Sequence, residues 1–240
     1  MGRIFEKRKA RMFARWSKTS KAFTKVGKEI AIAVKLGGPD PQGNPRLRMA
    51  IQTARSLNMP KDRIESAVKK ASSKDTAAMD EVNYEGYAPH GIAMFVETAT
   101  DNPTRTVANV RSIITKYGGS LGTAGSLDYL FERKGIFSIA KPEIDLEELE
   151  LELIDHGLEE MFESEEGLLI YCGFSEFGTM QKALESKNLE VKSAALQRIP
   201  LNQVELPKDH EAEVLKLVDL LEEDDDVQHV YHTMKVSGDH

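Results

Sequence analysis

The chain has 240 residues, among them 32 Lys and Arg and 39 Asp and Glu, and a length that allows one large domain or two to three small ones. No apolar run reaches the ~18 residues of a membrane span, and the charged N-terminus lacks the apolar segment of a secretory signal. The single cysteine, Cys172, excludes an intramolecular disulfide and is typical of a reducing compartment, so we expect a cytoplasmic protein.

The positive charge is concentrated at one end of the chain. Residues 1–74 contain 19 Lys and Arg against 5 Asp and Glu, which gives about +14, whereas the rest of the chain carries about −21. A basic block on an acidic body indicates that one end binds a polyanion while the other keeps the molecule in solution. The alternative is that the two parts neutralise each other within one molecule.

The basic block is predicted to be helical. Apolar residues between 21 and 36 follow helical spacing, and a separate stripe of lysines follows the same period. The Gly- and Pro-rich segment 37–43 is predicted to be a loop. Asn44 followed by Pro45 is a paired start signal for a second helix, and a third is expected from near Pro60. The basic residues 1–18 are also expected to be helical.

Strands alternate with helices after a polar linker predicted at 72–81. The expected helices are 102–117, 145–156, 175–187 and 209–222. The expected strands are 91–98, 127–132, 136–140, 158–163, 168–173, 189–199, 201–206 and 227–236.

This order predicts an α+β protein with three domains. The segment 134–199 contains a complete β-α-β-β-α-β unit, the ferredoxin-like arrangement. The segments 77–133 and 200–240 each hold part of a second unit, so we predict that the first is inserted into a connection of the second. The basic helical domain at 1–76 completes the chain.

Signals for enzymatic chemistry are weak, and we predict neither catalysis, nor a cofactor, nor a metal site. The chain has no phosphate-binding Gly-x4-Gly-Lys loop and no dinucleotide-binding Gly motif. His229 and His232 fall in a predicted strand, where their spacing places them on opposite faces. The acidic run 222–226 is expected to be a solvated helix end.

Signals for nucleic-acid binding are stronger. The outward-facing Lys and Arg of the basic helices are of the type that contacts phosphates, without distinguishing DNA from RNA. The candidate contacts are Lys21, Lys25, Lys28, Arg46, Arg48, Arg55, Lys61, Arg63, Lys69 and Lys70.

Several longer motifs resemble the YebC/PmpR family, which includes the mitochondrial translational activator of cytochrome c oxidase. They are Leu36-Gly37-Gly38-Pro39-Asp40-Pro41, Asn44-Pro45-Arg46-Leu47-Arg48, Asn58-Met59-Pro60-Lys61-Asp62, Tyr84-Glu85-Gly86-Tyr87-Ala88-Pro89, Thr100-Asp101-Asn102-Pro103-Thr104-Arg105-Thr106-Val107 and Phe131-Glu132-Arg133-Lys134-Gly135. The resemblance runs from about Phe23 to the C-terminus. Before that point the chain departs from the family's usual Gly-His-Ser-Lys-Trp start, although it stays basic.

The resemblance implies a cytoplasmic, non-enzymatic regulator of gene expression with a helical domain and two α/β domains. Some members of the family look like DNA-binding transcriptional regulators, and others look like ribosome-associated factors that relieve stalling at consecutive prolines. We expect a DNA-binding transcriptional regulator first, with ribosomal RNA and the ribosome as the alternative target. A different class, a protein-interaction module without nucleic-acid contact, also stays open.

Overall fold

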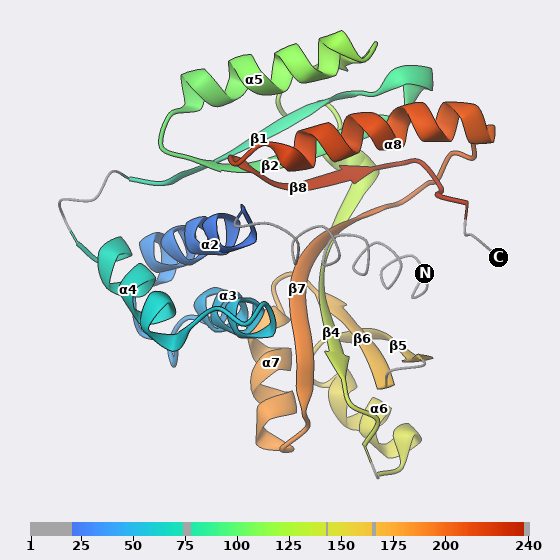
Figure 1. Ribbon diagram of the computed structural model, residues 1–240. Helices are drawn as coiled ribbons and strands as arrows, with labels where there is room; N and C mark the ends of the chain where they lie inside the picture. Colours follow the sequence, from blue (N-terminus) through green and yellow to red (C-terminus); the bar gives the residue numbers. More distant parts are fainter. Residues whose placement is uncertain (1–20, 74–77, 143, 165–166, 238–240) are drawn as a thin grey trace.

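A computed structural model describes residues 21–73, 78–142, 144–164 and 167–237. The helix expected within residues 1–18 lies outside these ranges. Figure 1 shows three parts, a group of helices beside two sheets that are stacked end to end and joined by long strands. Within the described ranges, no helix combines the length and apolar character that crossing a membrane requires.

The helical region consists of three helices that share one small core. They are α2 (Lys21–Gly37), α3 (Pro45–Ser56) and α4 (Lys61–Ala71). The helical spacing seen in the sequence explains this core, because Ile30, Leu47 and Ile64, one from each helix, are buried together.

Asn44 determines where α3 begins. Its Oδ1 accepts a hydrogen bond from the Leu47 amide at 3.0 Å, and Pro45 occupies the first helical position, as the sequence predicts. Its Nδ2 also donates to the carbonyl oxygens of Ala33 and Gly38, both at 2.8 Å, so one buried side chain joins α2, the loop and α3.

We expect Asn44→Ala to lower the free energy of unfolding by about 2–4 kcal/mol, because it removes a cap and leaves two carbonyl groups without their donor. Asn102 begins α5 (Pro103–Lys116) with the same Asn-Pro pair, but it is exposed and its side chain only accepts from the Arg105 amide. Asn102→Ala is therefore the matched control, with an expected cost of about 1 kcal/mol. Urea denaturation measures both, and equal costs would contradict the bracing role of Asn44.

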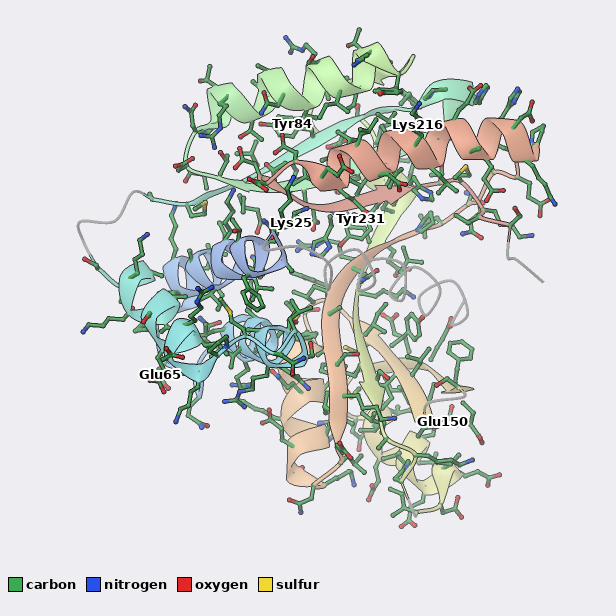
Figure 2. The ribbon with its side chains drawn as sticks, in the orientation of Figure 1. Lys25, Glu65, Tyr84, Glu150, Lys216 and Tyr231 are labelled. Atoms are coloured by element: carbon green, nitrogen blue, oxygen red, sulfur yellow. The ribbon has the colours of Figure 1, made fainter. Side chains whose placement is uncertain are left out.

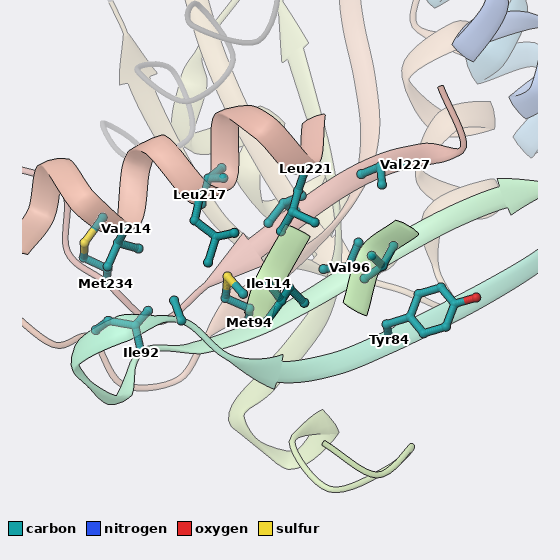
Figure 3. Packing of buried hydrophobic residues seen from close by; sticks show 14 residues of the cluster. Tyr84, Ile92, Met94, Val96, Ile114, Val214, Leu217, Leu221, Val227 and Met234 are labelled. Atoms are coloured by element: carbon teal, nitrogen blue, oxygen red, sulfur yellow. The ribbon is translucent and has the colours of Figure 1, made fainter. Parts of the chain in front are cut away.

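The first sheet has the strand order β3-β1-β2-β8 and is antiparallel throughout. Its helices α5 and α8 cover one face, and their apolar sides meet the sheet in the cluster that Figure 3 shows, with Leu217 of α8 above Met94 of β2. The remaining elements are β1 (Asp80–Tyr87), β2 (Ala93–Thr100), β3 (Ser120–Leu121), α8 (Lys208–Glu223) and β8 (Val227–His232), with a short 3-10 turn η1 (Pro89–Gly91).

The second sheet has the order β5-β6-β4-β7 and is also antiparallel. Its elements follow one another as β-α-β-β-α-β, which confirms the predicted unit. They are β4 (Phe131–Ile139), α6 (Leu146–Ile154), β5 (Leu158–Ser164), β6 (Gly167–Gly173), α7 (Phe177–Ser186) and β7 (Val191–Pro200). Phe137, Ile170 and Phe177 lie at the centre of its core.

Strand β8 pairs with β2, so the end of the chain does complete the sheet that begins before the insertion. The fourth strand of that sheet was predicted wrongly, however. Residues 201–206 form only an isolated bridge, between Val204 and Met234. In the second sheet, β6 is the inner strand beside β4; in the first sheet, β1 takes the equivalent position beside β2. The linker predicted at 72–81 is consequently too long, because Asp80 already pairs with Thr100 as the first residue of β1.

The strand expected at 127–132 is also wrong. Residues Asp128–Leu130 form a 3-10 turn, η2, and the strand that follows belongs to the second sheet, where Phe131 pairs with Pro200. These differences leave the fold class as predicted, an α+β chain with a helical region and two four-stranded sheets. The domain boundaries at 76, 133 and 199 stay a prediction.

Candidate nucleic-acid interface

Three lysines of α2 contact the C-terminal end of α8. Lys21 Nζ donates to the Glu223 carbonyl oxygen at 2.9 Å, Lys25 Nζ donates to that of Glu222, and Lys28 Nζ donates to that of Asp225 at 2.8 Å. Their i, i+4, i+7 spacing places them on one side of α2. The last carbonyl groups of a helix have no partners within it and carry its negative partial charge, so this end attracts ammonium groups.

Lys25 is the most deeply buried of the three, with 2% of its surface exposed. Burial lowers its pKa to about 8, although the nearby carboxylates of Glu222, Asp224 and Asp225 act in the opposite direction. Figure 2 shows Lys25 on the side of α2 that faces the first sheet, whereas Glu65 lies on the outer side of α4. Lys25 is thus an internal contact between the helical region and the acidic body.

Asp226 holds this junction together from the other side. Its carboxylate accepts from Lys28 Nζ at 2.5 Å, from Arg105 Nη2 at 2.9 Å and from the Thr106 hydroxyl at 2.8 Å. The side chain is only 5% exposed. It therefore joins α2, the beginning of α5 and the beginning of β8 at one buried point, which we call the Asp226 junction.

Two arginines of α3 make further internal contacts. Arg46 binds Glu29 at 2.7 Å and Glu81 at 2.5 Å, and these two carboxylates outweigh the effect of burial, so the pKa of Arg46 is raised. Arg48 donates to the carbonyl oxygens of Pro41 and Gln42 at 2.7 and 2.8 Å.

Half of the predicted site is therefore wrong in one respect, because its side chains do not face solvent together. The five residues concerned are Lys21, which stays exposed although it binds α8, and Lys25, Lys28, Arg46 and Arg48, which are buried or half-buried. Helical periodicity placed the three lysines of α2 correctly on one face, but that face lies against the acidic body. The outward face predicted for Arg48 and Arg55 is correct only for Arg55, because Arg48 is half-buried against the loop and α7. The acidic run is only in part the solvated helix end that was predicted, because Glu223 and Asp225 are exposed whereas Asp226 is buried against Lys28.

The other half of the predicted site is exposed, at the end of α3 and along α4. We call it the basic surface, and it consists of Arg55, Lys61, Arg63, Lys69 and Lys70. Lys61 is 3.6 Å from Glu65, but both side chains are largely exposed, at 88% and 67%, so water screens this pair. The Arg63 guanidinium lies 6.0 Å from the centre of the Phe23 ring.

The loop 37–43 connects the end of α2 to the beginning of α3 and is held in one shape. Asn44 binds the carbonyl oxygen of Gly38, Arg48 binds two further loop carbonyls, and the Gln42 amide donates to Asp40 Oδ1 at 3.0 Å. Gly38 adopts a φ of +83°, which favours glycine. Leu36, where the loop leaves α2, is 67% exposed.

Sequence reasoning missed the Asp226 junction altogether. Asp226 was predicted only as one member of an acidic run, and Arg105 only as part of a family motif. The signal was incomplete, because nothing local indicates that Arg105 and Asp226, 121 residues apart, meet. Among the residues described, no group of three or more His, Cys, Asp or Glu side chains is arranged to hold a metal ion.

Comparison with known proteins assigns the whole of this architecture to one family. Residues 3–74 match the family described as the TACO1/YebC protein N-terminal domain, and residues 79–234 match the TACO1/YebC second and third domain. The chain belongs to the TACO1/YebC family. The resemblance that the sequence motifs indicated is thereby confirmed.

Relatives within the TACO1/YebC family cover almost the entire chain. A protein of Flavobacterium johnsoniae and one of Porphyromonas gingivalis, each named a probable transcriptional regulatory protein, are both 55% identical. The alignments cover 98% of this chain, with 99% of the first relative and 98% of the second. A crystal structure of a conserved hypothetical protein from Aquifex aeolicus is 39% identical, covers 91% of both chains and has a TM-score of 0.78.

Proposed function

We propose that this TACO1/YebC protein is a cytoplasmic, nucleic-acid-binding regulator of gene expression that acts by binding rather than by catalysis. The observation that carries the proposal is the basic surface, whose five cations are exposed, whereas Lys25, Lys28, Arg46 and Arg48 are buried or half-buried at internal contacts. Lys and Arg on short exposed helices suit phosphate oxygens, which supply most of the affinity of such complexes. The relatives' names as probable transcriptional regulatory proteins support the same role.

DNA is the first candidate target, on the strength of those names, and DNA-binding control of transcription is the corresponding activity. A specific observation favours RNA on the ribosome as the second. The loop 37–43 is slim, rigidly held and begins beside an exposed Leu36, a shape that suits a narrow cavity in folded RNA.

A charge-removing variant of the basic surface tests the proposal. We expect the combined substitution Arg55→Gln, Arg63→Gln and Lys69→Gln to weaken binding to nucleic acid at least about tenfold at 100 mM salt. Each lost phosphate contact also lowers the slope of log K against log salt by about 0.9 on duplex DNA or about 0.7 on single strands. Fluorescence anisotropy across a salt series, with DNA and RNA of matched sequence, measures both quantities.

The matched control removes three exposed cations elsewhere, by Arg111→Gln, Lys182→Gln and Lys208→Gln on α5, α7 and α8. Both variants change the net charge equally, so a purely global electrostatic effect predicts equal losses. Equal losses, or full binding by the first variant, would exclude the basic surface as the site and favour the protein-interaction module.

The choice between DNA and the ribosome needs a measurement in cells. A strain that lacks the protein is compared with the parent by ribosome profiling, alongside a map of the protein's DNA occupancy. Promoter occupancy without altered ribosome pausing supports transcriptional control. Pausing at runs of proline codons without promoter occupancy supports the ribosomal function instead.

A further inference from the structure

A cleft lies where the helical region and the two sheets meet, which we call the central cleft. Its walls come from α2 and α3, from β1, β2 and β8 of the first sheet, and from β4 and β7 of the second. It encloses about 110 Å³, and a water needs roughly 10–15 Å³ by the same kind of measure, so the cleft has room for several waters or one small ligand.

Two arginines of this cleft are direct neighbours on adjacent strands. Arg133 of β4 is the register partner of Arg198 of β7, an arrangement that is unfavourable for like charges. Arg198 is compensated, because its guanidinium lies 2.9 Å from Glu97 and 2.6 Å from Asp128. Arg133 has no carboxylate within ion-pair distance among the residues that the structure describes, and lies 3.6 Å from the centre of the Phe174 ring.

The surroundings of Arg133 are consequently short of negative charge. Loss of solvation and the neighbouring charge of Arg198 together lower its pKa, and the more distant carboxylates of Glu97 and Glu81 offset this only in part. The carboxylates that line the cleft are already bound to other cations, Glu97 to Arg198, and Glu29 and Glu81 to Arg46. An anion beside Arg133 would supply what these contacts leave missing.

A second observation, independent of charge, points to a ligand with oxygen acceptors. Gln228 lines the same cleft and is only 7% exposed, yet its Nε2 has no hydrogen-bond acceptor within the described part of the chain. A buried donor without an acceptor is costly, so such groups mark places where a partner belongs. Thr53, Ser56 and Ser193 add hydroxyl groups to the lining.

We propose that the central cleft is a binding site for the phosphate group of a nucleotide, with Arg133 and Gln228 as its donors. A guanidinium matches two phosphate oxygens with two parallel hydrogen bonds, and the amide donates to a third oxygen. Met49, Ala99 and Leu196 provide an apolar part of the wall against which a base can lie. The site is separate from the basic surface and does not depend on the proposed function.

The same chemistry is offered by two sources, a free mononucleotide and the terminal phosphate of a nucleic-acid strand. Titration calorimetry with AMP, inorganic phosphate and adenosine on the full chain tests the site itself. We expect AMP and phosphate to bind and adenosine to bind at least about tenfold more weakly than AMP, because only the first two bring the anion. The proposal is overturned if the unaltered protein binds neither AMP nor phosphate.

Variants assign the binding to the two donors. We expect Arg133→Gln to weaken AMP binding about tenfold or more and Gln228→Leu to weaken it several-fold, whereas Arg111→Gln on α5 leaves it unchanged. Thermal unfolding checks that each variant folds, and Arg133 is exposed, so its replacement leaves the core intact. Unchanged AMP binding by a folded Arg133→Gln variant would overturn the assignment.

A final comparison identifies the source and separates this proposal from the previous one. A six-nucleotide strand with a 5′-phosphate is titrated beside the same strand without it. Tighter binding of the phosphorylated strand than of both the unphosphorylated strand and AMP supports a strand end as the ligand. Tighter binding of AMP than of either strand supports a free nucleotide. The triple variant of the basic surface is expected to bind AMP normally. Each of the two proposals can therefore be contradicted while the other still stands.

Discussion

Replacing Asp226 by alanine is expected to lower the free energy of unfolding by about 3–5 kcal/mol, the largest single effect that we predict. The carboxylate is 5% exposed and Lys28, its partner at 2.5 Å, is 14% exposed, so neither group has water as an alternative partner. The substitution leaves the Lys28 ammonium without its counter-ion. It also removes one acceptor of Arg105, which keeps Asp101, and one of Thr106, which keeps the Asn102 carbonyl oxygen. Urea denaturation near pH 7 measures the loss.

Asp225→Ala is the matched control at the neighbouring position. Lys28 reaches only the backbone carbonyl of Asp225, which alanine retains, and the Asp225 side chain is exposed. We expect this variant to stay within about 0.5 kcal/mol of the unaltered protein. If both variants unfold at the same urea concentration, the Asp226 junction contributes nothing.

The Asp226 junction also predicts a dependence on pH. Burial raises the pKa of Asp226, but hydrogen bonds from Lys28, Arg105 and Thr106 outweigh it and lower the pKa from 3.8 to about 2. A carboxyl whose pKa is lower in the folded state stabilises the fold above its unfolded pKa and loses this effect as the pH falls. The stability difference between the unaltered protein and Asp226→Ala is therefore expected to be complete above about pH 4 and to shrink towards pH 2.

Arg198→Met is expected to lower the free energy of unfolding by about 2–4 kcal/mol. Arg198 is 7% exposed, binds Glu97 of the first sheet, and places its guanidinium 3.7 Å from the centre of the Phe95 ring. Methionine keeps the length of the side chain but leaves Glu97, 21% exposed, without its cation. The cost is smaller than at Asp226 because the second partner, Asp128, is 61% exposed and recovers water.

A double substitution checks the cause of this loss. Adding Glu97→Gln to Arg198→Met removes the stranded charge, so the pair is expected to be more stable than Arg198→Met alone. Arg111→Met, at an exposed position of α5, controls for the change of residue type and is expected to cost about 0.5 kcal/mol or less. A pair no more stable than the single variant would show that Arg198 acts through packing on Phe95 rather than through Glu97.

The structure contains features of both interpretations of the charge split, internal neutralisation and an exposed basic region. Lys21, Lys25 and Lys28 neutralise the acidic end of α8 within the molecule, as the alternative interpretation held. The basic surface remains exposed and carries the proposed binding of nucleic acid. One uneven charge distribution thus supports the assembly of the fold and, elsewhere on the helical region, the proposed function.

Local signals in the sequence determined most of the elements. The Asn-Pro pairs at 44–45 and 102–103 fixed the first residues of α3 and α5, because a capping side chain and a fixed proline φ act within one helical turn. The continuous apolar run 168–172 fixed β6, the buried strand between β5 and β4. The family motifs could also be recognised from the sequence alone, since each consists of consecutive residues.

Only the tertiary structure decided which elements meet. Strand β1 is polar enough to resemble a linker, and its pairing with β2 on one side and β3 on the other makes it a strand. Helical spacing showed that the lysines of α2 share a face, but not what covers that face, because the carbonyl group that Lys25 binds lies 197 residues further along the chain. Periodicity specifies the faces of an element, whereas the partner of each face depends on how the whole chain packs.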